Sequence, residues 1–292
     1  MLRRLLNTRE HRYMKKRIIR CSVFAVFVAV MYFICYGGIT VPKYALTSPK
    51  IQSDEIRIVL LTDLHSVIYG KNQQVLIEHV KKQEPDLIFL VGDIADDRLP
   101  IRGTRLLLEG IQDLAPIYYT TGNHEYWSND IQTIRDEIEA YGVRILTDEY
   151  VHVTIRGTDL ILAGIEDPSK QLHEVANYNQ SMAMQNAFSD LENAEGYKIL
   201  LAHRPEKIEE YLLYPFDLVV SGHTHGGQIR IPYLLNGLYA PHQGLFPQYG
   251  GGRYEHDEAT HIISRGLAKD IKPRMFNPPE VVVITLVAEN AQ

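Results

Sequence analysis

The sequence contains very little cysteine. Its two cysteines, Cys21 and Cys35, lie in one apolar stretch near the N-terminus, and the rest of the chain has none. Disulfide bonds, thiolate metal sites and cysteine nucleophiles are therefore excluded from that larger part. Basic tracts are also missing beyond the first twenty residues, and the net charge is −6. Because nucleic acids are bound through concentrated positive charge, we expect no nucleic-acid partner.

The N-terminal residues have the composition of a membrane anchor. Residues 1–20 carry eight Arg and Lys residues against the single acid Glu10, and residues 21–41 contain no charged residue. A stretch of this length is at the short end of what spans a bilayer core of about 30 Å. Positive charge before a span favours a cytoplasmic N-terminus. We therefore expect a basic cytoplasmic tail at 1–20, a single-pass transmembrane helix at 21–41 and an extracytoplasmic domain held at the cell membrane.

Two other interpretations of this segment stay open. Arg3-Arg4 is similar to the start of a twin-arginine export signal, although a second basic cluster separates it from the apolar run. The apolar run also fits a buried core helix, but its basic flank would then have no purpose. No small-x-small cleavage site clearly follows the run, which favours an uncleaved anchor. Glycines and prolines interrupt regular structure after it, so we expect a tether at 42–54.

Residues 55–292 have the pattern of one globular domain. The chain is 45% hydrophobic and 23% charged, which is ordinary for a folded protein. Apolar strands alternate first with amphipathic helices and then with short turns. Helices are expected at 72–83, 106–114, 131–141 and 177–191, a hairpin at 152–163 and a closing strand at 281–287. This alternation predicts an α/β fold of two packed sheets with helices outside.

Five apolar stretches of strand length end in residues that can bind metal. These ends are Asp63-x-His65, Gly92-Asp93, Gly122-Asn123-His124, His203 and Gly222-His223-x-His225. Residues i and i+2 of a strand point to the same face, so the first pair projects together. The glycines before three of the ends indicate sharp backbone turns. Each end alone also fits a turn, a helix N-cap or a buried core histidine, but their recurrence at strand ends favours one common site.

The potential ligands are too numerous for one tetrahedral zinc site. Their carboxylate, imidazole and carboxamide groups suit Mn, Fe, Co or Zn rather than Ca or Mg. They fit two ions that share a carboxylate bridge and a bridging water or hydroxide. Paired ions of this kind serve in-line displacement at phosphorus. The sequence therefore points to metal-dependent hydrolysis of a phosphate ester.

The order of these motifs resembles that of the calcineurin-like metallophosphoesterases. Three stretches are similar to the membrane-anchored bacterial branch of that family, namely Thr62-Asp63-Leu64-His65, Leu201-Ala202-His203-Arg204-Pro205 and Gly222-His223-Thr224-His225-Gly226-Gly227-Gln228. The resemblance covers residues 55–288. It implies a four-layer αββα sandwich of two mixed sheets, with a dinuclear centre in the loops above the sheets and the N-terminal transmembrane helix in front.

The resemblance also implies a role for each ligand. One ion would be held by Asp63, His65 and His225, the other by Asn123, His203 and His223, and Asp93 would bridge both. His124 would bind no metal and would donate to the leaving oxygen or a phosphate oxygen, which makes it the expected catalytic residue. Asn123 and His124 would contact the substrate, and Asp96 would support the site. Two Mn ions are the favoured cofactors, with a hydroxide between them attacking phosphorus, and no ligand position is replaced.

The sequence indicates the substrate less clearly than it indicates the metal site. Residues 231–254 are rich in Tyr, Leu, Pro and Gly and form either an apolar rim for a lipid chain or a loop that packs back on the sheet. His242 within them either contacts phosphate or is structural. Anchored relatives include enzymes that split the pyrophosphate of UDP-diacylglucosamine, and an anchored hydrolase meets lipid-linked phosphates at high local concentration. We expect a lipid-linked substrate: a UDP-2,3-diacylglucosamine-type pyrophosphate or, outside the cytoplasm, a phospholipid or polyprenyl phosphate.

Other functions remain as alternatives. A non-catalytic metal-binding membrane scaffold would not need the intact His124 and the complete ligand set. An amidase or lactonase would favour a His-x-His-x-Asp-His cluster. A nuclease of the same superfamily would need a basic groove that this acidic domain lacks.

Overall fold

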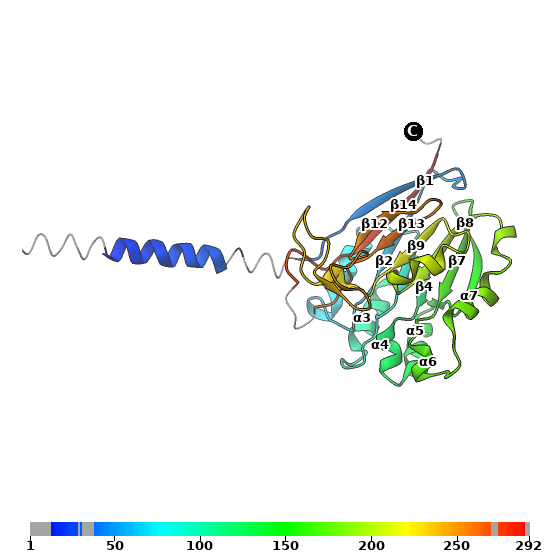
Figure 1. Ribbon diagram of the computed structural model, residues 1–292, viewed down its shortest axis with the longest axis horizontal. Helices are drawn as coiled ribbons and strands as arrows, with labels where there is room; N and C mark the ends of the chain where they lie inside the picture. Colours follow the sequence, from blue (N-terminus) through cyan, green and yellow to red (C-terminus); the bar gives the residue numbers. More distant parts are fainter. Residues whose placement is uncertain (1–12, 29, 31–37, 270–273, 290–292) are drawn as a thin grey trace, which may run out of the picture.

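The computed structural model describes residues 13–28, 30, 38–269 and 274–289. Figure 1 shows a domain of sheets and helices with an N-terminal helix projecting from one end. Residues 13–28 are helical and exposed.

The expected transmembrane helix is only partly covered by this description. Of residues 21–41, positions 29 and 31–37 lie outside the described residues, as do residues 1–12 of the expected tail. Among the residues that are described, no helix has both the length and the apolar character that a membrane crossing requires.

Six strands form the first sheet, in the order β1-β14-β2-β3-β4-β5. β14 is antiparallel to β2 and the other neighbouring pairs are parallel, so the sheet is mixed. The strands are β1 (Lys43–Ser48), β2 (Glu55–Leu61), β3 (Leu87–Val91), β4 (Ile117–Thr120), β5 (Arg144–Ile145) and β14 (Val282–Ala288). Because β2, β3 and β4 are parallel, their carboxyl ends meet at one edge of the sheet.

The second sheet is also mixed and has the order β12-β13-β9-β8-β7-β6. Its two outer pairs are antiparallel, whereas β13, β9, β8 and β7 run parallel to one another. The strands are β6 (Glu149–Ile155), β7 (Thr158–Ile165), β8 (Tyr197–Ala202), β9 (Leu218–Ser221), β12 (Gly252–Glu255) and β13 (Thr260–Ile263). The expected hairpin at 152–163 is the β6–β7 pair. A small antiparallel pair, β10 (Tyr239–Ala240) and β11 (Gly244–Leu245), lies in the loops after β9.

Helices cover the outer faces of both sheets. The first sheet carries α2 (Gln74–Lys81), α3 (Arg102–Ile111) and α5 (Ile131–Glu139), and the second carries α7 (Gln180–Phe188) and α8 (Ile208–Tyr211). The shorter helices are α4 (Asn123–Trp127), α6 (Lys170–His173), η1 (Lys71–Gln73), η2 (Leu191–Asn193), η3 (Pro205–Lys207) and η4 (His225–Gly227).

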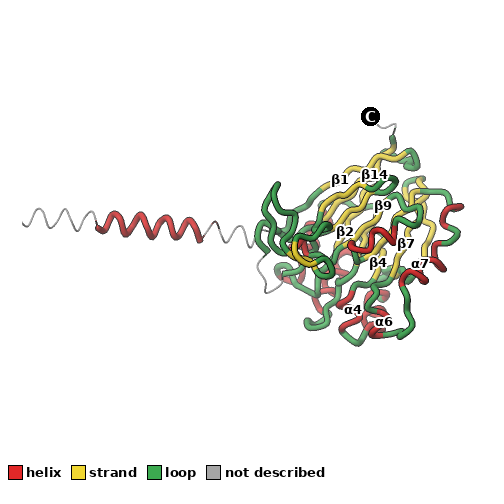
Figure 2. Tube along the Cα trace, viewed as in Figure 1, coloured by secondary structure: helices red, strands yellow, loops and turns green. Residues whose placement is uncertain are grey.

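Side-chain alternation along the strands produces the four layers. In β2, Ile58 and Leu60 belong to the apolar cluster between the sheets, whereas Val59 and Leu61 belong to the cluster beneath the helices. Because both faces of this strand are covered, its sequence is a nearly continuous apolar run. Figure 2 shows the resulting arrangement, with strands in the middle and helices outside. The predicted α/β architecture of two mixed sheets is confirmed.

Helix boundaries differ from the sequence prediction by a few residues. The helix expected at 106–114 is α3, which begins earlier, at Arg102. A Cβ atom on Gly103 would lie 1.8 Å from the carbonyl oxygen of Ser66, so the start of α3 packs directly on the loop after β2. The helix expected at 177–191 is the shorter α7, which begins after Asn179, whose side chain accepts a hydrogen bond from the N–H of Met182 at 3.0 Å.

The prediction of a tether at 42–54 is wrong for six of its thirteen residues. Lys43–Ser48 forms β1, which pairs in parallel with β14 along its whole length. Leu46 and Ser48 are buried while Lys43 is exposed, as expected of an edge strand with one covered face. The sequence prediction gave weight to the flanking prolines, but these limit the strand rather than prevent it. The folded domain therefore begins before residue 55.

Candidate metal centre

The polar residues at the five strand ends converge at one edge of the sandwich. Two groups of side chains, Asp63-His65-Asp93-His225 and Asp93-His203-His223, each place one donor atom per residue within 4.8 Å of the others. All of these residues are buried, and Asp93 belongs to both groups. The structure thus brings together the two ligand sets expected from the sequence, with Asp93 between them.

The donor atoms face one another closely. The Nε2 atoms of His65 and His225 are 3.3 Å apart, and His225 Nε2 lies 3.4 Å from a carboxylate oxygen of Asp63. His203 Nε2 lies 3.1 Å from Asp93 Oδ2. Imidazole nitrogens and carboxylate oxygens that converge in a buried space need a shared positive charge, either a proton or a metal ion. This donor set fits divalent cations.

Asn123, the remaining expected ligand, lies in the same place. The backbone N–H of the next residue, His124, donates to Asp93 Oδ1 at 2.8 Å. The side-chain oxygen of Asn123 is buried and has no hydrogen-bond partner in the described part of the chain. A buried acceptor without a partner is unfavourable, so this oxygen also fits a position beside a bound cation.

Asp93 and His203 shift each other's pKa strongly. Burial alone would raise the pKa of Asp93, but the adjacent His203 outweighs burial and holds the pKa well below its usual range. Burial opposes a charge on His203, yet Asp93 raises the pKa of this imidazole to about 10. Both shifts favour an ion pair in which His203 carries a proton and Asp93 is negative. Because ligands bind metal in their deprotonated form, a divalent ion at this position would displace that proton.

The backbone is strained at most of these ligands. Asp63, His65, Asp93, His223 and His225 have φ angles of 50°, 49°, 53°, 68° and 49°. Left-handed conformations of non-glycine residues cost about 1 kcal/mol or more each, and they cluster at functional sites. The turns are held by backbone bonds between loops, such as the Asp63 N–H to the Gly92 carbonyl at 3.0 Å. They direct the side chains toward the shared centre.

The glycines before three of the ligands do not all act as predicted. Gly92 has a φ of 72° and does form a turn, but Gly122 and Gly222 have no such φ. A Cβ atom on Gly122 would lie 2.3 Å from Asp93 Oδ1, and one on Gly222 would lie 2.5 Å from Asp63 Oδ2. At these two positions glycine provides space for a carboxylate rather than a sharp turn.

Glu125 organises two of the ligand loops, a role that the sequence analysis missed. Its carboxylate accepts backbone hydrogen bonds from Asp93, Ile94, Ala95 and Gly122 at 2.9, 2.7, 3.0 and 2.8 Å. Burial, together with the nearby charge of Asp93, raises the pKa of Glu125. The only signal in the sequence was its position three residues after Gly122, where a glutamate can accept a hydrogen bond from the N-cap N–H at the start of α4.

His124 lies beside the first group, oriented by two acids. Its Nδ1 atom is 2.6 Å from Asp97 Oδ1 and 3.3 Å from Asp96 Oδ1, and its ring centre is 4.3 Å from that of His65. Burial opposes a charge on His124, but the bonds to Asp96 and Asp97 outweigh burial and raise its pKa to about 9. Asp96 supports the site as expected from the sequence, whereas Asp97 was missed.

A buried arginine lies beside the second group. Arg204 binds Asp167 through Nε at 2.5 Å and Nη2 at 3.0 Å. Its Nη1 lies 3.1 Å from His223 Nε2 and 2.7 Å from His242 Nδ1. The sequence analysis assigned no role to Arg204 or Asp167 and left His242 open. The signal available for Arg204 was that it directly follows His203 at the end of β8.

Comparison with known proteins agrees with this geometry. The family model of the calcineurin-like phosphoesterases matches residues 56–227, more than half of the chain. An uncharacterized metallophosphoesterase of Helicobacter pylori is 27% identical to this chain. The aligned region covers 94% of this chain and 72% of the Helicobacter pylori protein. The metallophosphoesterase YkoQ of Bacillus subtilis is 29% identical, covering 78% of this chain and 82% of its own length. A zebrafish (Danio rerio) transmembrane protein with a metallophosphoesterase domain is 30% identical, covering 71% of this chain and 53% of its own length.

Proposed function

Because this chain belongs to the calcineurin-like phosphoesterase family, and is thus a metal-dependent phosphohydrolase, we propose that it is a membrane-anchored enzyme acting on a lipid-linked phosphate ester or pyrophosphate. The observation that carries the catalytic part is the pair of buried donor groups that share Asp93. Each part of the proposal rests on different residues.

The ligand roles follow from the two groups. We assign Asp63, His65 and His225 to one ion, Asn123, His203 and His223 to the other, and Asp93 to both. When bound, two divalent ions supply positive charge beside the phosphate oxygens and lower the pKa of an attacking water. Nitrogen and oxygen donors in this mixture suit Mn, Fe, Co or Zn, and Mn is favoured.

His124 and Arg204 act on the substrate itself. The acids Asp97 and Asp96 beside Nδ1 of His124 raise its pKa and so favour the protonated ring, whose other nitrogen can donate to a leaving oxygen. Arg204 is held rigidly by Asp167 and offers Nη1 at the second group. A fixed guanidinium suits an oxygen of the phosphoryl group.

Membrane anchoring and the outward location are supported by the sequence before the domain. Residues 1–20 are basic, residues 21–41 are uncharged, and a similar zebrafish protein is named for its transmembrane character. An enzyme held at the bilayer meets lipid-linked phosphates at high local concentration. The candidates are a UDP-2,3-diacylglucosamine-type pyrophosphate, a phospholipid and a polyprenyl phosphate. Protease digestion of intact cells tests the location, since protection of the domain would contradict the outward orientation.

Hydrolysis assays with two variants test the catalytic proposal. Full-length protein loaded with Mn is expected to hydrolyse an aryl phosphate or phosphodiester, and at least one lipid-linked ester. Asp93→Asn removes the shared carboxylate charge and His124→Ala removes the proton donor, so both should abolish turnover, while Asp93→Asn alone should also lower bound metal. His152→Ala, at an exposed position in β6, is the matched control. Undiminished turnover in both site variants would contradict the proposal.

A further inference from the structure

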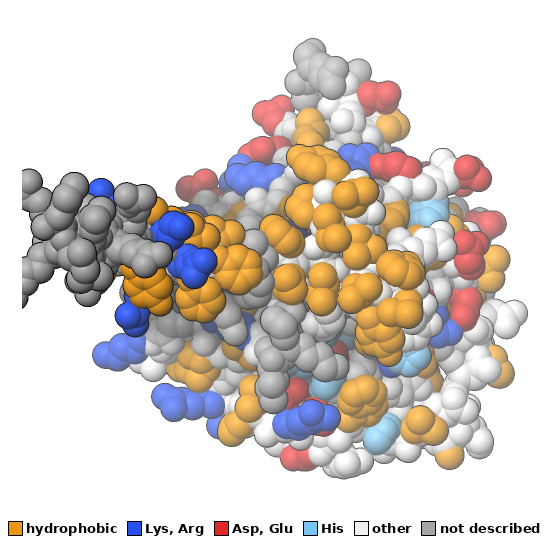
Figure 3. Space-filling model, turned by 60° about the vertical axis from the view of Figure 1, so that its left-hand side comes forward, with side chains coloured by type: hydrophobic (Ala, Val, Ile, Leu, Met, Phe, Trp, Pro, Cys, Tyr) orange, Lys and Arg blue, Asp and Glu red, His pale blue; other side chains and the backbone are white. Residues whose placement is uncertain are grey.

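The loops between η4 and β12 expose an unusual amount of apolar side chain. Tyr233, Leu234, Leu245 and Phe246 have exposed fractions of 108%, 84%, 67% and 67%. Figure 3 shows hydrophobic side chains gathered on one face of the domain. Large exposed apolar patches mark sites that bind another molecule or a membrane. We call residues 230–246 together with Phe276 the apolar loop surface.

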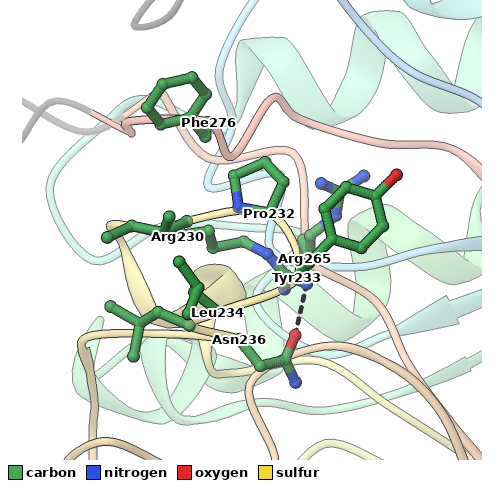
Figure 4. A pocket seen from close by; sticks show the side chains of 9 residues that line it. Arg230, Pro232, Tyr233, Leu234, Asn236, Arg265 and Phe276 are labelled. Carbon is green, nitrogen blue, oxygen red and sulfur yellow. Dashed lines mark hydrogen bonds between the residues drawn. The ribbon is translucent and has the colours of Figure 1, made fainter.

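This surface forms most of a pocket that has two arginines in its wall, Arg230 from the surface and Arg265 from the loop after β13. The pocket has a volume of about 480 Å³ and is lined by Arg230, Ile231, Pro232, Tyr233, Leu234, Leu235, Asn236, Arg265 and Phe276. Figure 4 shows Pro232, Tyr233, Leu234 and Phe276 arranged around the arginines. Guanidinium groups surrounded by apolar side chains suit a ligand that combines phosphate with hydrocarbon.

The positive charge in the pocket is only partly compensated. Arg265 forms an ion pair with Glu280. Arg230 donates from Nη2 to Asn236, but its Nη1 is buried and has no hydrogen-bond partner in the described part of the chain. Burial, and then the charge of Arg265, lower the pKa of Arg230. An anion in the pocket could accept a hydrogen bond from Nη1 of Arg230, and its negative charge would favour the charged form of this arginine.

The chain enters the domain at the wall of this pocket. Arg265 Nη2 donates to Thr40 Oγ1 at 3.2 Å, and the Thr40 N–H donates to the Pro279 carbonyl at 2.9 Å. In Figure 1 the gold loops after β9 lie at the end of the domain from which the N-terminal segment leaves. The uncharged run 21–41 includes Tyr36, which precedes Thr40 by four residues, or at most about 14 Å of extended chain. A membrane that holds this run would therefore lie against the apolar loop surface.

We infer that the apolar loop surface docks on the lipid bilayer, with Tyr233, Leu234, Leu245 and Phe246 in the interface and the Arg230–Arg265 pocket around a lipid phosphate. Apolar and tyrosine side chains next to cationic ones are the composition of interfacial membrane contacts. The inference rests on the membrane-anchored part of the proposed function and does not depend on catalysis.

A residue next to the apolar loop surface also contacts the loop that carries His225. Asn277, next to Phe276 in the chain, donates from Nδ2 to the carbonyl of His225 at 2.7 Å and to that of Gln228 at 3.1 Å. The surface therefore connects through one side chain to a residue of the first ligand group.

Depth-dependent fluorescence quenching tests the docking. The protein has a single tryptophan, Trp127, so full-length wild type in phosphatidylcholine–phosphatidylglycerol vesicles supplies the baseline. Leu234→Trp adds a tryptophan on the surface. Leu172→Trp is the matched control, because Leu172 is 82% exposed and lies in α6, away from these loops in Figure 1. Lipids brominated in the acyl chains should quench the tryptophan added at position 234 and leave the one added at 172 at the wild-type level.

Two results would overturn the inference. One is equal bromine quenching of the two added tryptophans. The other is a blue shift at position 234 that grows with the protein-to-lipid ratio without bromine quenching, which would identify a second copy of the chain as the occupant.

An activity ratio separates this inference from the proposed function. The double variant Leu234→Ser/Phe246→Ser should lower the rate on a vesicle-embedded phosphate ester severalfold more than the rate on a soluble aryl phosphate. If wild type hydrolyses neither substrate, the proposed function fails, and the quenching result still decides the docking. An unchanged ratio with an active wild type would count against docking alone.

Discussion

Glu125 is enclosed by backbone N–H groups from two ligand loops. Oε1 accepts from Ile94 and Ala95, and Oε2 accepts from Asp93 and Gly122. Hydrogen bonds to a charged acceptor are stronger than neutral ones, and a buried carboxylate without them would be very unfavourable. The position of Asp93 between the two histidine groups therefore depends on a residue that need not touch metal or substrate.

We predict that Glu125→Gln destabilises the protein strongly. The amide has one oxygen, so its nitrogen would face two N–H donors, and the loss is expected to be about 3 kcal/mol or more in the free energy of unfolding. The same change at the half-buried Glu137, which pairs with Arg105 and binds no backbone N–H group in the described chain, should cost far less. Urea unfolding of both variants measures the difference, and equal costs would show that the enclosed carboxylate has no special role.

His261 makes stability depend on pH although it belongs to neither donor group. It is fully buried in β13, with Nε2 2.9 Å from Ser221 Oγ. Burial, with a smaller effect from His256, lowers its pKa from 6.5 to about 3. Between these two values the unfolded chain binds a proton that the folded protein does not. The contribution of His261 therefore falls as pH drops from 6.5 toward 3.

We predict that His261→Gln reduces the acid sensitivity of the fold. At pH 5 the histidine should cost about 2 kcal/mol relative to pH 7, because each unit of pKa difference is worth about 1.4 kcal/mol. The difference in unfolding free energy between pH 7 and pH 5 should shrink by this amount in the variant. His152→Gln, at an exposed position, provides the comparison. An identical pH dependence in wild type and His261→Gln would refute the prediction.

At the scale of elements, β1 extends the domain toward the chain entry. Leu46 is 4% exposed and belongs to the apolar cluster between the sheets. β1 pairs only with β14, so it is an edge strand whose stability depends on that cluster and on the parallel ladder. Because β1 begins at Lys43, only one residue separates the first sheet from the uncharged run 21–41.

We predict that Leu46→Ala lowers the free energy of unfolding by about 2–4 kcal/mol, the usual cost of removing a buried leucine side chain. A residue in a solvated tether would cost almost nothing, so the experiment distinguishes the two descriptions of this segment. Lys43→Ala, exposed in the same strand, is the control. Denaturant unfolding of the full-length protein provides the measurement, and a null effect of Leu46→Ala would favour the tether.

At the scale of the whole molecule, the site joins the two sheets. Asp63, Asp93 and Asn123 follow strands of the first sheet, whereas His203 and His223 follow strands of the second. Bound ions would therefore cross-link the two halves of the sandwich. A ligand that binds only the folded state stabilises it by about 2.7 kcal/mol when present at 100 times its dissociation constant.

We predict that chelation lowers the melting temperature of the wild type by several degrees and that added Mn restores it. For a chain of this size, about 1 kcal/mol corresponds to a shift of roughly 2–4 °C. In Asp93→Asn the shift should be much smaller, since both ions lose a ligand. Thermal unfolding followed by circular dichroism is the measurement. If chelator leaves the melting temperature of the wild type unchanged, the protein does not hold a stabilising metal ion.

The sequence by itself determined the candidate ligands and the layered fold. Both depend on patterns that are local in the chain. Runs such as Leu87–Val91 are apolar because both of their faces are covered, and Asp93 follows such a run at the point where the backbone leaves the sheet. Parallel strands then bring their carboxyl ends to one edge, so local order along the chain becomes proximity in space.

Only the tertiary structure decided which side chains hold the ligands in place and where the domain begins. Glu125, Asp97 and Arg204 act mainly through partners on other loops. The sequence marks Glu125 and Arg204 only by their positions near the ligands and does not reveal these partners. β1 exists because β14, more than two hundred residues later, offers it a partner. Gly122 and Gly222 are glycines because carboxylates from other strands occupy the space of their missing side chains. Contacts between distant segments are set by packing of the whole chain, and this is why they could not be inferred from any single stretch of it.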